Sequence, residues 1–187
     1  MYKFNMIEKF PCEPRALFER TMRNFDEYAE FSPDVKRVEE LSREKLADGR
    51  EKITIRVFAN NIMPAPVRMM FKMSGEMDWK ESYIVDMEKP SADWNVETPI
   101  FNEYVDCCGT SWFREVPGGC EIVITGAMKI EAPPIPGIPT SVVRGVIEMI
   151  EPFVGKMVTM NLQKYFKSIR ACVEKEARLS KRVANSE

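Results

Sequence analysis

The residue types that could carry out chemistry in this chain are limited, because its 187 residues include no histidine. This absence excludes Ser/His and Cys/His nucleophile pairs, histidine-containing zinc sites and the commonest general base. Catalysis would have to use carboxylates, lysine, tyrosine or cysteine. We find no phosphate-binding loop, metal-ligand spacing or Ser/Lys nucleophile motif, and we predict no metal and no cofactor.

The cysteines offer a second kind of chemistry, but their spacing is not typical of a redox or metal site. They number five, with no CxxC pair. This pattern argues against a disulfide framework and a four-cysteine zinc site, and it predicts buried free thiols in a reducing compartment. A hairpin turning at residues 117–119 would place Cys107 and Cys108 opposite about residues 127–129 rather than opposite Cys120. Nothing nearby in the sequence indicates a lowered thiol pKa.

One carboxylate stands where the pattern of the chain predicts an apolar group. In residues 71–88, seven of the nine odd positions are apolar but only one of the nine even positions, which predicts a strand with one buried face. Glu81 lies at an odd position. An unpaired charge there would be costly, so we expect Glu81 to be ion-paired, protonated or hydrated, unless a bulge turns it to solvent. The candidate partners are Arg56, Arg114 and Arg144.

The elements that must position these residues follow from alternation, helical spacing and turn signals. The predicted order is strand 2–10, helices 14–24 and 26–31, strands 35–46, 53–59, 71–88, 92–96, 104–116 and 120–130, and a helix over 140–173. Residues 35–46 also show a helical spacing of three, but Asp48-Gly49 is a hairpin signal that favours strands on both sides. Four prolines make residues 132–139 a stiff linker, and Pro152 should kink or divide the last helix.

This order resembles the helix-grip fold of the START-like superfamily, which includes polyketide cyclases, coenzyme Q-binding proteins and lipid-transfer domains. The local resemblance is strongest in PCEPRALF, residues 11–18, and in FDEYAEFSPDVKRV, residues 25–38. The resemblance implies one α+β domain over residues 1–187. In it, a curved antiparallel sheet of about seven strands wraps around a long, kinked C-terminal helix and encloses an apolar cavity. It does not imply a reaction.

Methionine and aromatic residues are the candidates for lining that cavity, and the chain has thirteen methionines. Flexible thioethers suit an apolar ligand of irregular shape, and aromatic rings add shape and polar groups, although both residue types also fill ordinary cores. Together with the implied fold they favour a pocket. The candidate ligand-binding residues are Val57, Met63, Met70, Met73, Met77, Trp79, Glu81, Tyr83, Trp94, Trp112, Ile124, Met128, Ile150, Phe153 and Met157.

We therefore expect noncatalytic binding or transport of a hydrophobic small molecule, such as a lipid, sterol, quinone or polyketide. One alternative is a polyketide cyclase or dehydratase that uses Glu, Asp or Tyr in acid-base chemistry. Another is an interaction module whose apolar groove takes a protein segment. START-like lipid carriers often keep a buried acidic-basic pair in the cavity, so the resemblance implies that Glu81 holds a ligand hydroxyl or carbonyl.

Charge and hydropathy limit the binding partners and the cellular location that we expect for the protein. With 27 basic and 29 acidic residues the net charge is -2, which argues against nucleic-acid binding. The chain has no signal-peptide core and no long apolar run, so we predict a soluble, cytoplasmic protein. The apolar, proline-interrupted residues 62–70 are expected to act as a lid, with residues 133–139 as the opposite rim. The lid and the basic residues of 164–182 are compatible with transient membrane contact. Basic residues at a helix C-terminus are equally what the helix dipole favours, and this is the preferred interpretation. No oligomeric state is predicted.

Overall fold

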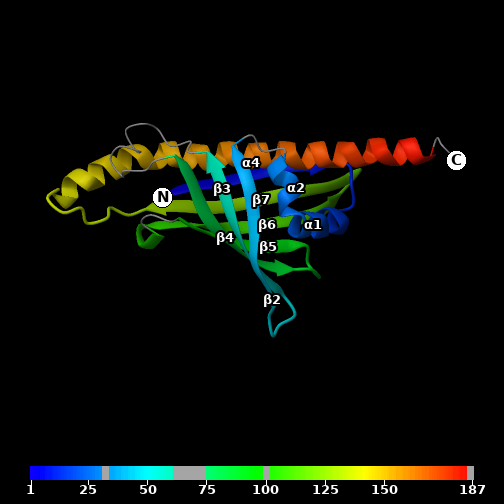
Figure 1. Cartoon of the computed structure of the whole chain (residues 1–187), viewed down its shortest axis with the longest axis horizontal. Helices are drawn as coiled ribbons and strands as arrows, with labels where there is room; N and C mark the ends of the chain where they lie inside the picture. Colours follow the sequence, from blue (N-terminus) through cyan, green and yellow to red (C-terminus); the bar gives the residue numbers. More distant parts are fainter. Residues whose placement is uncertain (31–33, 61–74, 99–101, 185–187) are drawn as a thin grey trace.

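The protein adopts an α+β fold in which a curved antiparallel sheet wraps around a long C-terminal helix (Figure 1). The computed structural model describes residues 1–30, 34–60, 75–98 and 102–184. The strand order is β1-β7-β6-β5-β4-β3-β2, so β1 and β2 form the edges of the sheet. The strands are β1 (Tyr2–Phe10), β2 (Val35–Lys45), β3 (Glu51–Asn60), β4 (Glu76–Asp86), β5 (Ser91–Glu97), β6 (Val105–Val116) and β7 (Gly119–Ile130). The helices are α1 (Pro14–Arg23), α2 (Phe25–Glu30), the short 3-10 helix η1 (Asn102–Tyr104) and α4 (Thr140–Ala184).

The predicted order of elements is confirmed, and so is the predicted register of the β6-β7 hairpin. Cys107 lies opposite Met128, and Cys108 lies opposite Ala127. None of the five cysteines, all of which are described, forms a disulfide. The expectation of buried thiols holds for three of them, whereas Cys108 is exposed and Cys12 is half-buried.

Two irregularities in β2 explain why this strand has apolar residues at a helical spacing. The register between β2 and β3 shifts between Val35 and Arg37, and it shifts again further along the strand. An extra residue in one strand reverses the alternation of the side chains that follow it. Val35 and Val38 are three residues apart and yet both line the concave side of the sheet, whereas Leu41 is 47% exposed.

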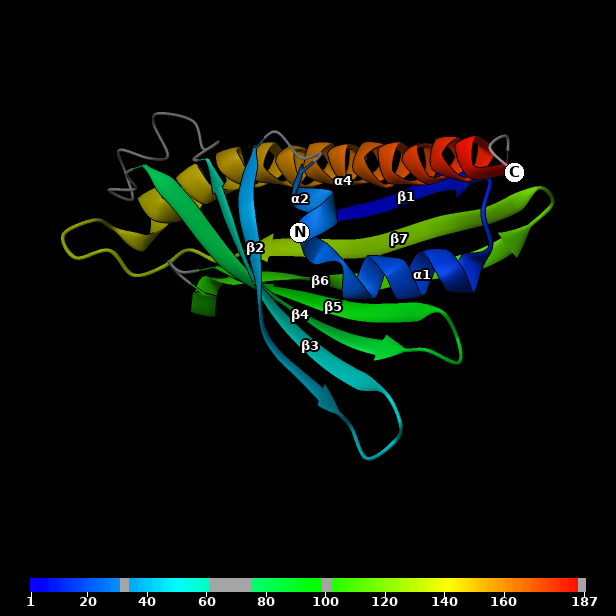
Figure 2. The same cartoon turned by 45° about the vertical axis from the view of Figure 1, so that its right-hand side comes forward.

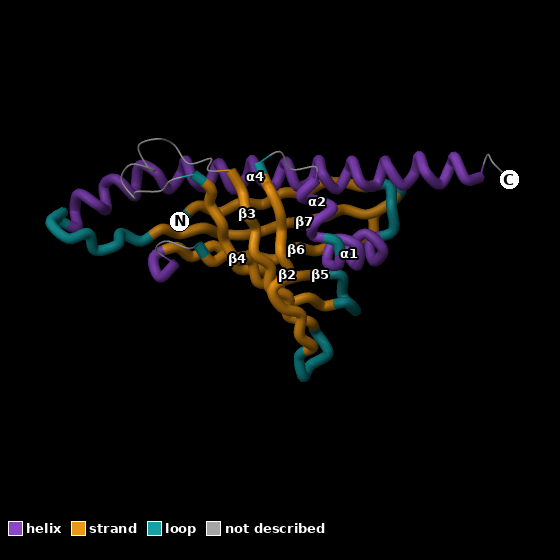
Figure 3. The backbone as a smooth tube through the Cα atoms, viewed as in Figure 1, coloured by secondary structure: helices purple, strands orange, loops and turns teal. Residues whose placement is uncertain are grey.

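Helix α4 is much longer than the sheet that it crosses. Its 45 residues correspond to about 68 Å, whereas the 12 residues of β6 or β7 span about 40 Å. The helix therefore runs past the strands, as the backbone view shows (Figure 3). Pro152 lies inside the continuous helix, and the first turns, yellow in Figure 1, bend away from the axis of the remainder, as expected of a proline. Within the described residues, no helix has the length and apolar character needed to cross a bilayer.

The main core lies between the sheet, α1 and the later turns of α4. Phe18 of α1 packs edge-to-face against Phe113 of β6, with ring centroids 5.0 Å apart. Phe10 of β1 contacts Phe166 of α4, with centroids 6.3 Å apart. Figure 2 shows α1 running alongside β6 and β7, in agreement with its contacts. These aromatic contacts fill the space between sheet and helix at this end of the molecule.

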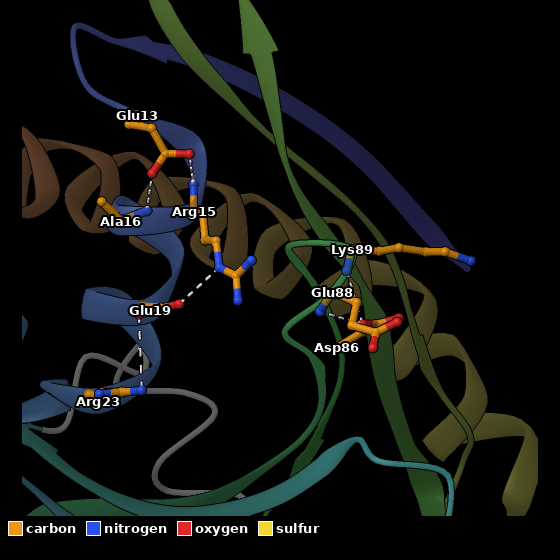
Figure 4. Close-up of polar contacts among 8 residues, drawn as sticks. All are labelled: Glu13, Arg15, Ala16, Glu19, Arg23, Asp86, Glu88 and Lys89. Atoms are coloured by element: carbon orange, nitrogen blue, oxygen red, sulfur yellow. Dashed lines mark hydrogen bonds and ion pairs between the residues drawn. The ribbon is translucent and has the colours of Figure 1, made fainter.

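Local polar contacts hold the start of α1 and the turn between β4 and β5. The Glu13 carboxylate accepts hydrogen bonds from the backbone N–H groups of Arg15, at 2.9 Å, and Ala16, which is the role of an N-cap (Figure 4). Asp86 likewise accepts hydrogen bonds from two backbone N–H groups of the β4-β5 turn, at 2.9 and 3.0 Å. Both features are built from residues close together in sequence.

A pair of glycines allows two aromatic rings to approach the sheet closely. Gly109 of β6 and Gly126 of β7 lie opposite each other. A Cβ atom on Gly109 would lie 2.4 Å from the ring of Trp94, and one on Gly126 would lie 2.5 Å from the ring of Phe4. The two rings are stacked, with centroids 6.0 Å apart. The glycines thus determine how far the Trp94 indole stands above the sheet.

Candidate ligand-binding site

A concave pocket of about 320 Å³ lies between the inner face of the sheet and the middle of α4. This volume is at the lower end of the range for small-molecule sites. The sheet contributes Ile55 and Val57 of β3 and alternate residues of the neighbouring strands, and α4 contributes Val158 and Leu162. Met22, Phe25 and Ala29 of the two short helices complete the wall. The lining is mainly apolar, with a few polar groups set into it.

The sequence-predicted site residues fall into three groups. Six of them line the pocket: Val57, Trp79, Glu81, Tyr83, Trp94 and Ile124. Six others are described but do not line it: Met77, Trp112, Met128, Ile150, Phe153 and Met157. Met63, Met70 and Met73 lie outside the described residues, as does the predicted lid, residues 62–70. Residues 133–139, the expected rim, are irregular, and none of them lines the pocket.

The alternation of side chains along β6 explains why Trp112 does not line the pocket. Their position on α4 explains why Ile150, Phe153 and Met157 do not line it either. Cys107, Ser111 and Phe113 of β6 line the pocket, so Trp112 lies on the outer face, where the guanidinium carbon of Arg114 is 5.3 Å from its ring centroid. The pocket residues of α4 begin at Val158, which follows Met157 directly and comes one to two turns after Phe153 and Ile150. Helical spacing defines a stripe along α4, but it does not indicate which turns of that stripe meet the sheet.

The residues of α1 and α2 in the pocket wall were not predicted as ligand-binding residues. Met22 and Phe25 belong to the apolar face of the first predicted helix, and that spacing identifies a buried face. It carries no information about whether the buried face meets core or cavity. Cys107, Asn161 and Tyr165 were also missed, since single residues of these types carry no signal in the sequence.

Glu81 faces the pocket and is bound by its neighbours on the same strand. The indole N–H of Trp79 donates a hydrogen bond to Glu81 Oε1 at 2.6 Å, and the Tyr83 hydroxyl donates to Oε2. Residues two apart on a strand share one face, so β4 alone supplies this three-residue polar cluster.

None of the three arginines that the sequence offered as candidate partners pairs with Glu81. The Arg56 guanidinium pairs with Asp78, with Nε 2.6 Å from Oδ2, and Arg114 lies over Trp112. Arg144 is exposed on α4. No ion pair links Glu81 to a basic residue in the part of the chain that the structure describes. The carboxylate therefore depends on two neutral donors.

The pocket keeps both Tyr83 and Cys107 protonated at neutral pH. Burial, followed by the negative charge of Glu81 and the hydrogen bond to it, raises the pKa of Tyr83 well above its ordinary value. Burial, with smaller effects from Cys108 and Glu81, raises the pKa of Cys107 to about 12. Tyr83 is therefore a persistent hydrogen-bond donor, and the Cys107 thiol is not activated as a nucleophile.

The other charged groups of the pocket form an ion pair between α4 and the start of β2. Lys164 of α4 contacts the carboxylate of Asp34, and both residues line the pocket. A second basic residue of the C-terminal stretch, Arg170, pairs with Glu8 of β1. Two of the basic groups predicted to favour membrane contact are thus engaged within the protein. Within the described residues, no cluster of three His, Cys, Asp or Glu side chains could hold a metal ion.

Comparisons with solved structures support the fold at low sequence identity. A Thermus thermophilus protein superposes with a TM-score of 0.66 at 15% identity, over 93% of this chain and 98% of that chain. A Streptomyces aromatase/cyclase gives 0.66 at 13% identity, over 95% and 96% of the two chains. A START superfamily protein from Mycobacterium smegmatis gives 0.54 at 13% identity, over 94% and 99%. No protein-family model and no curated protein matches the sequence. The chain thus has the START-like helix-grip fold.

Proposed function

We propose that this protein binds and transports a hydrophobic small molecule in the pocket between the sheet and α4. The observation that carries the proposal is the mainly apolar pocket of about 320 Å³, with the Glu81 cluster and the Lys164–Asp34 ion pair in its wall. Apolar walls supply binding energy by burying ligand surface, and a few polar groups orient the ligand. Solved structures of similar fold include a START superfamily protein and an aromatase/cyclase, which fits such a role.

The first test asks whether the purified protein carries a ligand. Native mass spectrometry is combined with organic extraction, and displacement of a neutral fluorescent probe, Nile red, is measured in parallel. We expect either a co-purifying apolar compound or saturable probe binding. A protein that is empty and does not bind the probe would contradict transport.

A pocket-filling variant connects binding to this pocket. Val96 of β5 lines the pocket, and Val96→Trp should occupy its volume and abolish saturable probe binding. The matched control is Leu41→Trp, a similar enlargement at a position that is 47% exposed. Equal probe binding by the two variants would place the probe elsewhere on the protein.

A second candidate function is acid-base catalysis of the cyclase or dehydratase type, favoured by the contact between Tyr83 and Glu81. The raised pKa of Tyr83 keeps a proton donor in an apolar pocket. Incubation with a poly-β-ketone thioester, followed by mass spectrometry, would detect the loss of water. Turnover that Tyr83→Phe abolishes would support an enzyme, whereas binding without turnover would support a carrier.

A further inference from the structure

Among the residues that the structure describes, the pocket wall contains one acidic side chain without a basic partner. Its formally charged lining residues are Asp34, Glu81 and Lys164. Lys164 pairs with Asp34, so these two charges cancel. Glu81 contacts only neutral donors. By formal charge, this leaves Glu81 as the one acidic side chain of the described pocket wall that no basic side chain balances.

The two hydrogen bonds to Glu81 leave it able to accept more. A carboxylate has about four acceptor positions, and Trp79 and Tyr83 occupy one on each oxygen. Both donors are neutral, so they stabilise the charge without cancelling it. Trp79 and Tyr83 also place aromatic rings next to the carboxylate, and aromatic faces attract cations.

The surroundings of Glu81 make its charge more effective than a surface charge. Its cross-strand neighbours are Ile55 and Val96, both of which line the pocket. Apolar neighbours lower the local dielectric constant, and the interaction between two charges strengthens as that constant falls. A cationic ligand group beside Glu81 would be attracted strongly, and an anionic group would be repelled by the same effect.

We infer that the ligand of this pocket is a hydrophobic amine, whose protonated nitrogen pairs with Glu81 while its apolar body fills the rest of the pocket. The inference rests on the proposed binding function and specifies the ligand class. It differs from the sequence-based expectation that Glu81 holds a hydroxyl or carbonyl. A carbonyl oxygen cannot donate a hydrogen bond, and a fatty-acid carboxylate would place a second negative charge next to the first.

The test compares three ligands that share a ten-carbon chain and differ in their head group. Decylamine, decanol and decanoate are titrated against the Nile red complex below their aggregation concentrations. For the wild type we expect the amine to bind at least about tenfold more tightly than the alcohol, and the carboxylate to bind most weakly. For Glu81→Gln we expect the affinity for the amine to fall about tenfold or more. The affinity for the alcohol should change by less than about threefold.

A matched control removes a carboxylate from the outer face of the neighbouring strand. Glu97 of β5 is exposed, so Glu97→Gln makes the same change in total charge without changing the pocket. The Glu97→Gln variant should keep the wild-type preference for the amine over the alcohol and the carboxylate. An equal loss of amine binding in both variants would mean that total charge, rather than Glu81, sets the preference, and would overturn the inference.

The remaining outcomes separate the inference from the proposed function. If none of the three ligands displaces the probe and the probe itself does not bind, the proposed function fails. If all three bind with similar affinity, or if Glu81→Gln keeps the amine preference, the binding function stands and the amine inference is overturned. The order of affinities for the wild type is itself a test, because it does not depend on how well a variant folds.

Discussion

Helix α4 packs differently on the two sides of residue 158. From Val158 onward its apolar residues join the main core, among them Phe166 and Ile169, which are 5% and 0% exposed. The described residues 140–157 lie outside that core. They bury a smaller set, Val143 and Ile147, which are 4% and 5% exposed, and leave Met149 and Phe153 72% and 46% exposed. The helix pattern continues through both regions, but only the later region packs into the main core. An apolar helix face is therefore buried only where the tertiary structure provides a partner.

The early part of α4 is held instead by a small set of contacts with β1 and β7. Glu151 accepts a hydrogen bond from the backbone N–H of Ile130 at 3.1 Å. Tyr2 packs against Gly155, and its hydroxyl lies 3.1 Å from Oγ1 of Thr159. Together with the buried side chains of Val143 and Ile147, these contacts hold the early part of the helix, whereas the later part joins the main core. The pocket lies beside the transition between the two regions, where Val158 is the first α4 residue in its wall.

Truncating one phenylalanine in each region of α4 should give the largest difference in the free energy of unfolding. Phe166→Ala should lower the free energy of unfolding by about 3–5 kcal/mol, because it removes a buried ring from the core. Phe153→Ala should change it by about 1 kcal/mol or less, since the residue is already 46% exposed. Urea denaturation followed by circular dichroism measures both values. A comparable loss in the two variants would show that an unrecognised partner covers Phe153.

Two glycines in the early part of α4 should respond oppositely to alanine. A Cβ atom on Gly155 would lie 2.3 Å from the Tyr2 ring, so Gly155→Ala should destabilise the protein by about 1–3 kcal/mol. Gly145 has nothing within 4 Å of such a Cβ, so Gly145→Ala should stabilise it by about 0.5–1 kcal/mol through helix propensity. Thermal unfolding gives the sign of each change. If both variants gain stability, the contact between Tyr2 and α4 does not constrain the helix.

The smallest effect concerns the polar attachment at Glu151. A hydrogen bond from the amino group of Met1, followed by that from Ile130, lowers the pKa of Glu151. A carboxyl whose pKa is lower in the folded state contributes stability above its unfolded pKa, and it loses that contribution as the pH falls through the folded pKa. Glu151→Gln should therefore cost less than about 1 kcal/mol at pH 7, because the ion pair is partly solvated. This difference from wild type should shrink below about pH 4.5.

Denaturation of both proteins between pH 7 and pH 3 measures this dependence. A difference that stays constant with pH would mean that the charge of Glu151 contributes nothing and that only its shape matters.

The sequence alone determined the features that depend on neighbours along the chain. Alternation and turn residues located the strands, and the turn at residues 117–119 set the register that places Cys107 opposite Met128. The alternation of side chains along β4 placed Glu81 on the same face of the strand as Trp79 and Tyr83. These inferences succeeded because side chains alternate with a period of two, and because a tight turn determines which residues pair across a hairpin.

Only the tertiary structure decided what each face meets. Both Trp112 and Phe113 are apolar, and the curvature of the whole sheet decides that Phe113 faces the pocket and Trp112 faces outward. In the same way, the apolar stripe of α4 does not reveal where the sheet ends beneath it. Glu81 carries a charge in the sequence, but its lack of a cationic partner depends on where every arginine of the described chain lies. Periodicity orders side chains relative to their own strand or helix, whereas burial and charge compensation depend on distances between elements far apart in sequence.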